Sequence, residues 1–314
     1  MVVIMKKESK YTSGQKIIIF FAAFIITFIS ICNIFKNDIN FLLLQRRVER
    51  TYGNAAPNSY FIEDNFEFVN NNEKLEVNSK QDIIDSIYYL INSGITYSER
   101  YCGKDYKECY NDINSVSNNE KTLNLLNNFV HPYNSYKSIK FSFNNEIIKI
   151  TISYTYTKEE IDKINNKIDE IIKNNIDNNM TIKDKIKTIH DYIINNTDYD
   201  TLKIDNIKDE TYKSNTAYGV LIEGYGICSG YSDAMKIFLD KFNIVNYKIN
   251  NEEHIWNLVQ LNGKWYHLDL TWDDPISNKN VTRDSYFLID NNTLKILDDK
   301  EHNFNGSIFK EAIK

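Results

Sequence analysis

The longest apolar stretch of the chain covers residues 17–35 and lies between Lys16 and Lys36. A helix of this length would extend about 28 Å, which is close to the roughly 30 Å hydrocarbon core of a bilayer. The pattern predicts a transmembrane helix. A cleaved signal peptide is the alternative, but the stretch is longer than a usual signal core and no small-x-small cleavage site follows it.

The first part of the remaining chain mixes polar and alternating segments. Residues 36–59 are polar and lack a clear period, which predicts an irregular linker. Residues 60–157 predict a small α/β segment, because apolar side chains recur at helical spacing in 83–91 and 123–130. In the same segment, 139–143 and 147–156 alternate strictly around Asn144 and Asn145, which predicts a β-hairpin.

The second part, residues 158–314, predicts helices followed by strands. Thr157 and Thr181 each precede an amphipathic run, so a helix is expected after each of them. A further helix is expected to begin at Cys228. Strands are predicted at 245–250, 255–261, 264–271 and 284–289, with a tight turn at Asn262-Gly263. Helices packed on an antiparallel sheet give an α+β domain.

Charge is distributed unevenly around the apolar stretch. The chain has a net charge of −6, while residues 1–50 carry eight Lys or Arg and three Asp or Glu. This basic end suits anionic lipid headgroups, and the acidic remainder argues against a nucleic-acid partner. Nearly equal numbers of Lys and Arg lie on the two sides of the span, so they do not decide its orientation. A single N-terminal span followed by a large domain usually acts as an uncleaved signal anchor, and we infer the orientation from that. We expect residues 1–16 in the cytoplasm and the C-terminal domain outside it, at the cell membrane.

The four cysteines have different settings. Cys32 lies in the predicted span. Cys102 and Cys109 enclose a short polar loop and could form a disulfide outside the cell. Two unpaired thiols are an alternative, and half of a metal site is a weaker one, because no second Cys or His pair accompanies them. Cys228 stands alone.

Cys228 is the first candidate for chemistry. It follows a glycine-punctuated turn and begins a predicted helix, where the positive end of the helix dipole favours the reactive thiolate. His254 begins one predicted strand and Asp269 lies in another. Two adjacent antiparallel strands could therefore hold an imidazole between a thiolate and a carboxylate. His267 is a competing histidine, two residues from Asp269.

Three segments carry a family resemblance: G-Y-G-I-C-S-G-Y, H-I-W-N and G-K-W-Y-H-L-D-L-T-W-D-D-P. They resemble the transglutaminase-like superfamily over roughly residues 181–290. The resemblance implies a papain-like core, with Cys228 as nucleophile, His254 as general base and acid, and Asp269 as the group that orients the imidazole. It also implies that an oxyanion donor comes from upstream of the cysteine.

Tyr199 and Tyr218 are the candidates for that donor, although ordinary packing is the alternative for each. Trp256, beside His254, is the tryptophan expected to contact substrate. His190 is expected to be a locally hydrogen-bonded helix residue, and no partner is predicted for His131 or His302. The acidic residues Asp198, Asp200 and Asp205 lack a calcium-loop spacing, so neither a metal nor a cofactor is predicted.

These inferences predict a membrane-anchored, extracytoplasmic cysteine enzyme that acts on amide bonds through a thioester. Its substrates would be proteins or peptides, including cell-wall peptides. Hydrolysis is slightly favoured over transfer to an amine, since nothing in the sequence identifies a channel for an acceptor lysine. One alternative is a non-catalytic surface module that binds peptide or glycan. Another is an assembly scaffold in which the span and residues 60–157 carry the role.

Overall fold

The computed structural model describes residues 12–144, 146–274, 284–297 and 300–314. The chain divides into two compact units, Met1–Asn54 and Ala55–Lys314. Most of the segment 1–16 that was predicted to be cytoplasmic lies outside the described residues, as does Asn145 of the predicted hairpin turn.

The first unit contains two helices, α1 (Ser13–Ile34) and α2 (Lys36–Tyr52). A capping box between Thr12 and Gln15 begins α1. With a mean hydropathy of 2.7 and none of its apolar window buried, α1 is long and apolar enough to cross a membrane. The irregular linker predicted from residue 36 is wrong over α2. That segment is polar, but it is rich in Leu, Gln, Arg and Glu, which are good helix formers.

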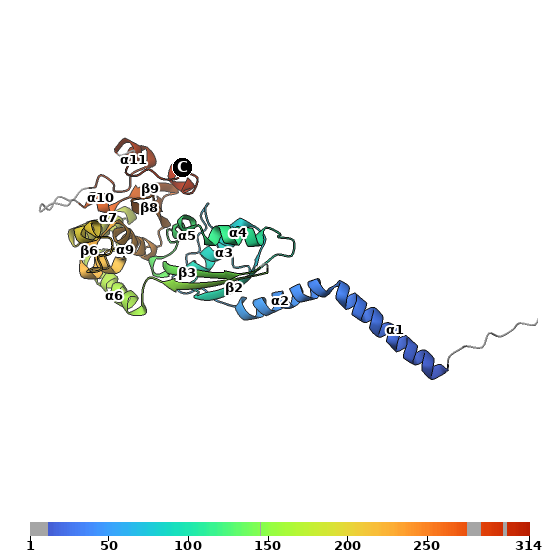
Figure 1. Cartoon of the computed structure of the whole chain (residues 1–314). Coiled ribbons are helices and arrows are strands. Elements are labelled where there is room, and N and C mark those ends of the chain that lie inside the picture. Colours follow the sequence, from blue (N-terminus) through green and yellow to red (C-terminus); the bar gives the residue numbers. More distant parts are fainter. Residues whose placement is uncertain (1–11, 145, 275–283, 298–299) are drawn as a thin grey trace, which may run out of the picture. The chain divides into compact units, whose positions relative to one another are not determined.

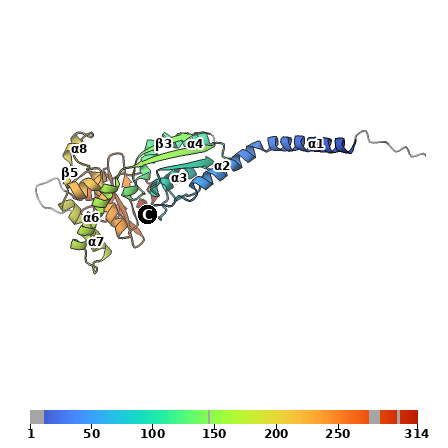
Figure 2. The same ribbon diagram turned by 90° about the horizontal axis from the view of Figure 1, so that it is seen from below.

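The second unit holds all the strands of the described chain (Figures 1 and 2). Its elements in chain order are β1 (Glu76–Val77), α3 (Lys80–Asn92), β2 (Tyr97–Cys102), α4 (Cys109–Ser117), α5 (Glu120–Leu126), η1 (Pro132–Asn134), β3 (Tyr136–Phe143), β4 (Ile147–Tyr154), α6 (Lys158–Asn175), α7 (Ile182–Asn195), β5 (Asp198–Tyr199), α8 (Thr201–Asp205), η2 (Gly219–Glu223), β6 (Tyr225–Gly226), α9 (Cys228–Lys241), β7 (Asn246–Asn250), β8 (Ile255–Leu261), β9 (Lys264–Leu268), α10 (Leu270–Asp273), α11 (Asn291–Leu297) and η3 (Lys310–Ile313).

A four-stranded sheet with the order β1-β2-β4-β3 forms one half of this unit. Its β3–β4 pair is the hairpin expected from the alternating sequence. Along β4 the isoleucines 148, 150 and 152 are buried, while the residues between them are exposed. Helices α3, α4 and α5 lie on one side of the sheet (Figure 1). This half is therefore a two-layer α/β arrangement with one face of the sheet open.

A disulfide joins Cys102, at the end of β2, to Cys109, at the start of α4. Both residues are buried, and their Cα atoms are 6.0 Å apart. The bond therefore links the sheet to the helical layer that covers it.

A three-stranded antiparallel sheet, β7-β8-β9, lies in the other half, and residues 262 and 263 form its tight turn. Helix α9 packs on one face through Met235 and Phe238, which share a core with Val259 of β8. The opposite face, including Leu258, packs against Phe129. Both faces of this sheet are thus buried, which explains why β7 and β8 show almost unbroken burial instead of alternation.

This arrangement removes the domain boundary predicted between residues 157 and 158. Phe66 and Phe129, from the segment 60–157, contact Tyr247 of β7 with ring centroids 5.1 and 4.9 Å apart. Phe309, near the C-terminus, joins the same core. Residues 55–314 therefore form a single α+β body, in which α6 and α7 lie at the end away from α3 and α4 (Figures 1 and 2).

The strand predicted at 284–289 is reduced to one antiparallel bridge between His267 and Ile289. β9 also ends earlier than predicted, at Leu268. The chain then turns into the short helix α10, and this change of direction determines the position of Asp269.

Candidate active site

Cys228 is the first residue of α9, as the sequence predicts. Ile227 is the N-cap, and among the described residues no side chain caps this end of the helix. The first N–H groups of α9 are therefore directed at the thiol region without a competing side-chain acceptor. Cys228 is partly exposed and lines a cleft.

Glycine is required before and after Cys228 for two different steric reasons. Gly224 has a φ of +77°, and it ends the π-helical turn η2 in the left-handed region that favours glycine. Gly230 lies so close to the preceding loop that an added Cβ would be 2.2 Å from the Ser214 carbonyl oxygen. The motif around Cys228 thus allows η2, its loop and α9 to pack closely.

His254 immediately precedes β8 and is held by a tight turn. Its backbone N–H donates to Asn251 Oδ1 at 2.7 Å, and its carbonyl accepts from the Asn251 N–H at 3.0 Å. The imidazole stacks on Trp256, with ring centroids 5.5 Å apart and planes 15° apart. Turn and stacking together restrict the ring to one orientation.

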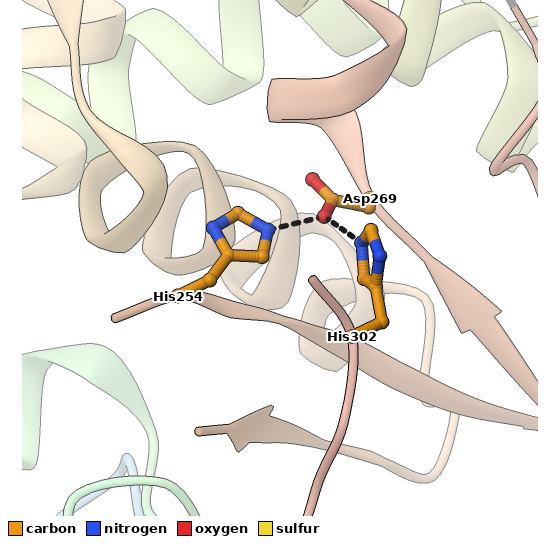
Figure 3. Close-up of side chains that lie close together, drawn as sticks. All are labelled: His254, Asp269 and His302. Carbon is orange, nitrogen blue, oxygen red and sulfur yellow. Dashed lines mark hydrogen bonds and ion pairs between the residues drawn. The ribbon is translucent and has the colours of Figure 1, made fainter. Parts of the chain in front are cut away.

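Asp269 is the N-cap of α10 and not a strand residue, which corrects the sequence prediction. Its Oδ1 accepts hydrogen bonds from the backbone N–H groups of Thr271 and Trp272 at 2.9 and 3.2 Å. Its Oδ2 lies 2.5 Å from His254 Nε2 (Figure 3). Aspartate is a favoured N-cap residue, so capping α10 also orients the carboxylate toward the histidine.

Cys228 and His254 line the same cleft, and Cys228 is one of the groups that raise the pKa of the imidazole, after Asp269. Ser232, one turn along α9 from Cys228, connects the start of this helix to the first residue of β8. Its Oγ lies 2.8 and 3.0 Å from the carbonyl oxygens of Cys228 and Ile255, and its one proton can be donated to either of them. Of the three residues that the sequence predicts as a set, His254 and Asp269 are in contact, and Cys228 lines the same cleft as His254.

Electrostatics favour a charged imidazole in this arrangement. Burial alone would lower the pKa of His254, but the Asp269 carboxylate and the contact with Cys228 raise it to about 10. Burial would raise the pKa of Asp269, yet the charge and hydrogen bond of His254 and the hydrogen bond of His302 hold it well below its usual range. An imidazolium paired with an ionised carboxylate is the electrostatic state this geometry favours.

The residues proposed around the triad are found in different places. Tyr199 lines the cleft with Cys228. Burial and the charges of Cys228 and Asp269 raise the pKa of Tyr199 to about 12, so the phenol keeps its proton. Tyr218 is not among the cleft-lining residues; the Lys213 ammonium lies 5.4 Å from its ring centroid. Tyr199 therefore remains the stronger candidate for a second donor.

The expectation that Trp256 contacts substrate is wrong for this structure, because its side chain is 1% exposed. Its indole N–H donates to His267 Nδ1 at 3.0 Å. Burial lowers the pKa of His267 to about 3, which leaves it a neutral acceptor. His267 is therefore a packing partner and not a rival to His254. Trp272, which is 38% exposed, forms the aromatic wall of the cleft.

His190 bonds to its neighbour Asp191, as expected for a locally bonded helix residue, and also reaches a partner that the sequence did not suggest. Its Nδ1 is 2.9 Å from Asp191 Oδ1, and its Nε2 is 3.1 Å from Asp273 Oδ2. His131 accepts a hydrogen bond from the Tyr133 N–H at 3.1 Å, away from Cys228.

Sequence reasoning missed His302. This residue follows α11, and its Nε2 lies 2.9 Å from Asp269 Oδ2, the same oxygen that His254 contacts (Figure 3). His302 is 33 residues beyond Asp269 and belongs to no periodic segment. The only available signal was that it is one of five histidines in the chain.

The cleft beside the triad has a volume of about 1830 Å³. Its walls come from α5 and the residues after it, from the turn before β8, and from residues 300–309. Asparagines are prominent in the lining, at positions 124, 127, 128, 250, 251, 303 and 305. The segment 60–157 therefore supplies one wall. Pockets for small ligands usually measure about 300–1,000 Å³, so this cleft suits a longer molecule.

Among the described residues, His254, Asp269 and His302 are the group whose ligand atoms come within 4.8 Å of one another. Zinc bonded at its usual lengths would separate tetrahedral ligand atoms by about 3.3 Å. Here the two nitrogens lie 2.5 and 2.9 Å from the same carboxylate oxygen. These are hydrogen-bond distances, so the trio as arranged does not fit a metal ion.

Comparisons with known proteins add little to this description. No family model and no curated protein matches the chain. A solved structure described as "Crystal structure of a TGase" is similar to it with a TM-score of 0.34 and 18% identity. The match covers 48% of this chain and 48% of that one, so the chain spans about half the length of that structure. A likeness at this level carries no argument about activity.

Proposed function

We propose that this protein is a cysteine enzyme that cleaves or transfers amide bonds through a thioester intermediate. The observation that carries the proposal is the contact between His254 and Asp269 beside a cleft that Cys228 and His254 both line. We also assign the fold of residues 158–314 to the transglutaminase-like type, on the motifs around these three residues.

In the proposed mechanism the Cys228 thiolate attacks the carbonyl carbon of an amide. The carbonyl oxygen becomes an oxyanion, which the Cys228 N–H and the Tyr199 hydroxyl stabilise. His254 gives its proton to the nitrogen of the leaving amine as the C–N bond breaks, and a thioester remains. Water or a second amine then attacks the thioester, and His254 takes up its proton as the thiolate leaves. Asp269 keeps the imidazole in the required tautomer throughout.

The proposed substrate is a protein or peptide chain, including peptides of the cell wall. The support is the size of the cleft and its many side-chain amides, which can pair with a peptide backbone. α1 would anchor the enzyme in the cell membrane with the second unit outside the cytoplasm. The disulfide between Cys102 and Cys109 supports that location, since disulfides persist in oxidising compartments.

The test is the reactivity of Cys228 in the full chain, purified in detergent without reductant. Iodoacetamide labelling of the Cys228 peptide is followed by mass spectrometry, which separates it from Cys32. At pH 6 an ordinary thiol is almost entirely protonated, so an activated Cys228 should react at least about tenfold faster than the same residue in His254→Ala. Equal rates in two folded proteins would contradict the proposal and favour the non-catalytic binding module.

Product analysis then separates hydrolysis from transfer. Wild type and Cys228→Ala are incubated with a peptide library and a fluorescent primary amine. New carboxyl groups that require Cys228, at a cleaved C-terminus or where a glutamine has become glutamate, indicate hydrolysis. Amine incorporation that requires Cys228 indicates transfer.

A further inference from the structure

His302 contacts the proposed triad at its carboxylate. Its side chain is fully buried, and its Nε2 lies 2.9 Å from Asp269 Oδ2 (Figure 3). The ring planes of His302 and His254 are 90° apart, with centroids separated by 5.3 Å. The two rings therefore approach one oxygen from different directions. Since an ionised carboxylate only accepts hydrogen bonds, both contacts require an N–H on the histidine.

The His302 ring is fixed by aromatic neighbours on three sides. It stacks on Tyr286 with centroids 4.8 Å apart and planes 23° apart. Trp256 meets it nearly edge to face at 4.9 Å, and Trp272 lies at 5.5 Å. A ring packed in this way cannot turn its donor away from Asp269 without disturbing these contacts. The donor is therefore already in place before substrate binds.

The two oxygens of Asp269 have different supports. Backbone N–H groups of α10 hold Oδ1, whereas side-chain donors from two separate segments hold Oδ2. Without His302, His254 would be the one remaining side-chain donor to Oδ2 among the described contacts, and in the proposed function it must also exchange protons with Cys228 and substrate. His302 donates a second hydrogen bond to Oδ2 and takes no part in that proton exchange.

On this basis, and assuming the proposed function, we infer that His302 is a positioning residue: it holds Asp269 Oδ2 in line with His254 so that the imidazolium stays directed at Cys228. His302 does not line the cleft, so it would act only through Asp269. In chemical terms the site is a triad with a second histidine behind its carboxylate.

Other titratable groups near Asp269 come from each neighbouring element. Cys228 belongs to α9, Tyr199 to β5, His267 to β9 and Asp273 to α10. His267 is held neutral by burial, and Asp273 is paired with His190. Of the described groups, His254 and His302 are therefore the side chains that donate to Oδ2.

The test is the pH profile of iodoacetamide labelling at Cys228 in the full chain, comparing wild type, His302→Phe, His302→Gln and His254→Ala. Phenylalanine fills the aromatic site without an N–H, whereas the glutamine amide can replace the Nε2 donor. With one donor fewer, the ionised carboxylate is less stabilised and the imidazolium is held less firmly. We expect the acid limb of the His302→Phe profile to lie about one pH unit above that of wild type. The acid limb of the His302→Gln profile should lie close to the wild-type position.

Each outcome separates this inference from the proposed function. If wild type and His254→Ala react equally, the proposed function fails. If they differ while a folded His302→Phe keeps the wild-type acid limb, the positioning role fails and the proposed function stands. An acid limb that moves downward would also overturn the inference, since it would show His302 to be a competitor for Asp269.

A second measurement covers the case in which His302→Phe does not fold. Nitrogen-15 NMR of the wild-type chain labelled at its five histidines should show hydrogen-bonded Nε2–H signals for both His254 and His302. Both should change in Asp269→Asn. A His302 ring protonated only at Nδ1 would overturn the assignment.

Discussion

Two histidine–aspartate pairs lie at opposite ends of α10, and only one has the surroundings of an active site. Asp269 caps the helix and pairs with His254, whereas Asp273, its last residue, pairs with His190 at 3.1 Å. The second ring nitrogen of His190 is occupied by Asp191, and His190 and Asp273 are both fully buried. His254 is instead bonded to one carboxylate and lines a cleft together with Cys228.

This difference shows that a histidine–carboxylate pair alone does not indicate catalysis. A ring with both nitrogens bonded to carboxylates has no position from which to exchange a proton with a substrate. The His190 pair instead connects α7 to the end of α10, and so supports the helix that Asp269 caps. The His190–Asp273 pair therefore supports α10, and α10 in turn positions Asp269 beside His254.

The largest expected difference between the two pairs is in the free energy of unfolding that is lost when each histidine is removed. His190→Ala would leave Asp273 buried with the Tyr286 N–H as its remaining donor among the described contacts, a loss of about 3–5 kcal/mol in the free energy of unfolding. His254→Ala should cost less when both are measured near pH 9, where most of the stabilisation from protonated His254 is gone and Asp269 keeps His302 and two backbone donors. Urea denaturation of both variants measures the difference. Equal losses of stability would contradict the division into a structural and a reactive pair.

The free energy of unfolding should depend on pH in opposite ways for the paired histidines, His190 and His254, and for His267. Pairing raises the pKa of His254 to about 10, so its contribution is complete below pH 6.5 and is lost as the pH rises toward 10. Burial lowers the pKa of His267 to about 3, so the unfolded chain alone takes up a proton between pH 6.5 and 3. Stability should therefore fall on the acid side by about 1.4 kcal/mol per pH unit from this group.

The matched variant is His267→Asn, whose carbonyl can accept the Trp256 N–H without titrating. Denaturation between pH 4.5 and 6.5 should show a shallower slope for this variant, by about 2–3 kcal/mol over the interval. Parallel curves would mean that His267 is protonated in the folded protein.

The smallest of these effects concerns the carboxylates. In Asp269→Asn the amide still caps α10, but its NH₂ group would face His254 Nε2 and force the imidazole proton onto the edge facing Cys228. Labelling of Cys228 at pH 6 should slow by about tenfold or more. Asp273→Asn should label within about threefold of wild type. Slowing of both variants by the same factor would indicate loss of structure and not of a tautomer.

The sequence singled out Cys228, His254 and Asp269 as a set because each lies at a recognisable local boundary. Cys228 opens an amphipathic helix, and His254 and Asp269 flank the strands of a hairpin with a clear turn. His302 had no such marker, since its contact with Asp269 depends on how the irregular C-terminal segment packs over the sheet. Trp256 was misjudged because the two-residue spacing places it beside His254 but does not show that His302 and Phe304 of the C-terminal segment cover it.

The fold was predictable to a similar extent. Regular alternation predicted the β3–β4 hairpin, and capping residues predicted α6 and α7. The polar composition of residues 36–52 concealed a helix. The boundary placed at 157 failed because the apolar residues of β7 and β8 pack against partners more than a hundred positions earlier in the chain, which a local pattern cannot show.

The burial of both faces of the β7-β8-β9 sheet has a consequence for how the protein unfolds. One face contacts helices that follow residue 157, and the other contacts side chains that precede it. Neither group can be removed without exposing an apolar sheet to water, so residues 55–314 should lose their structure in one cooperative transition. The cysteine, both histidines and the aspartate would then separate in a single event, and no partly unfolded form would keep the four side chains together.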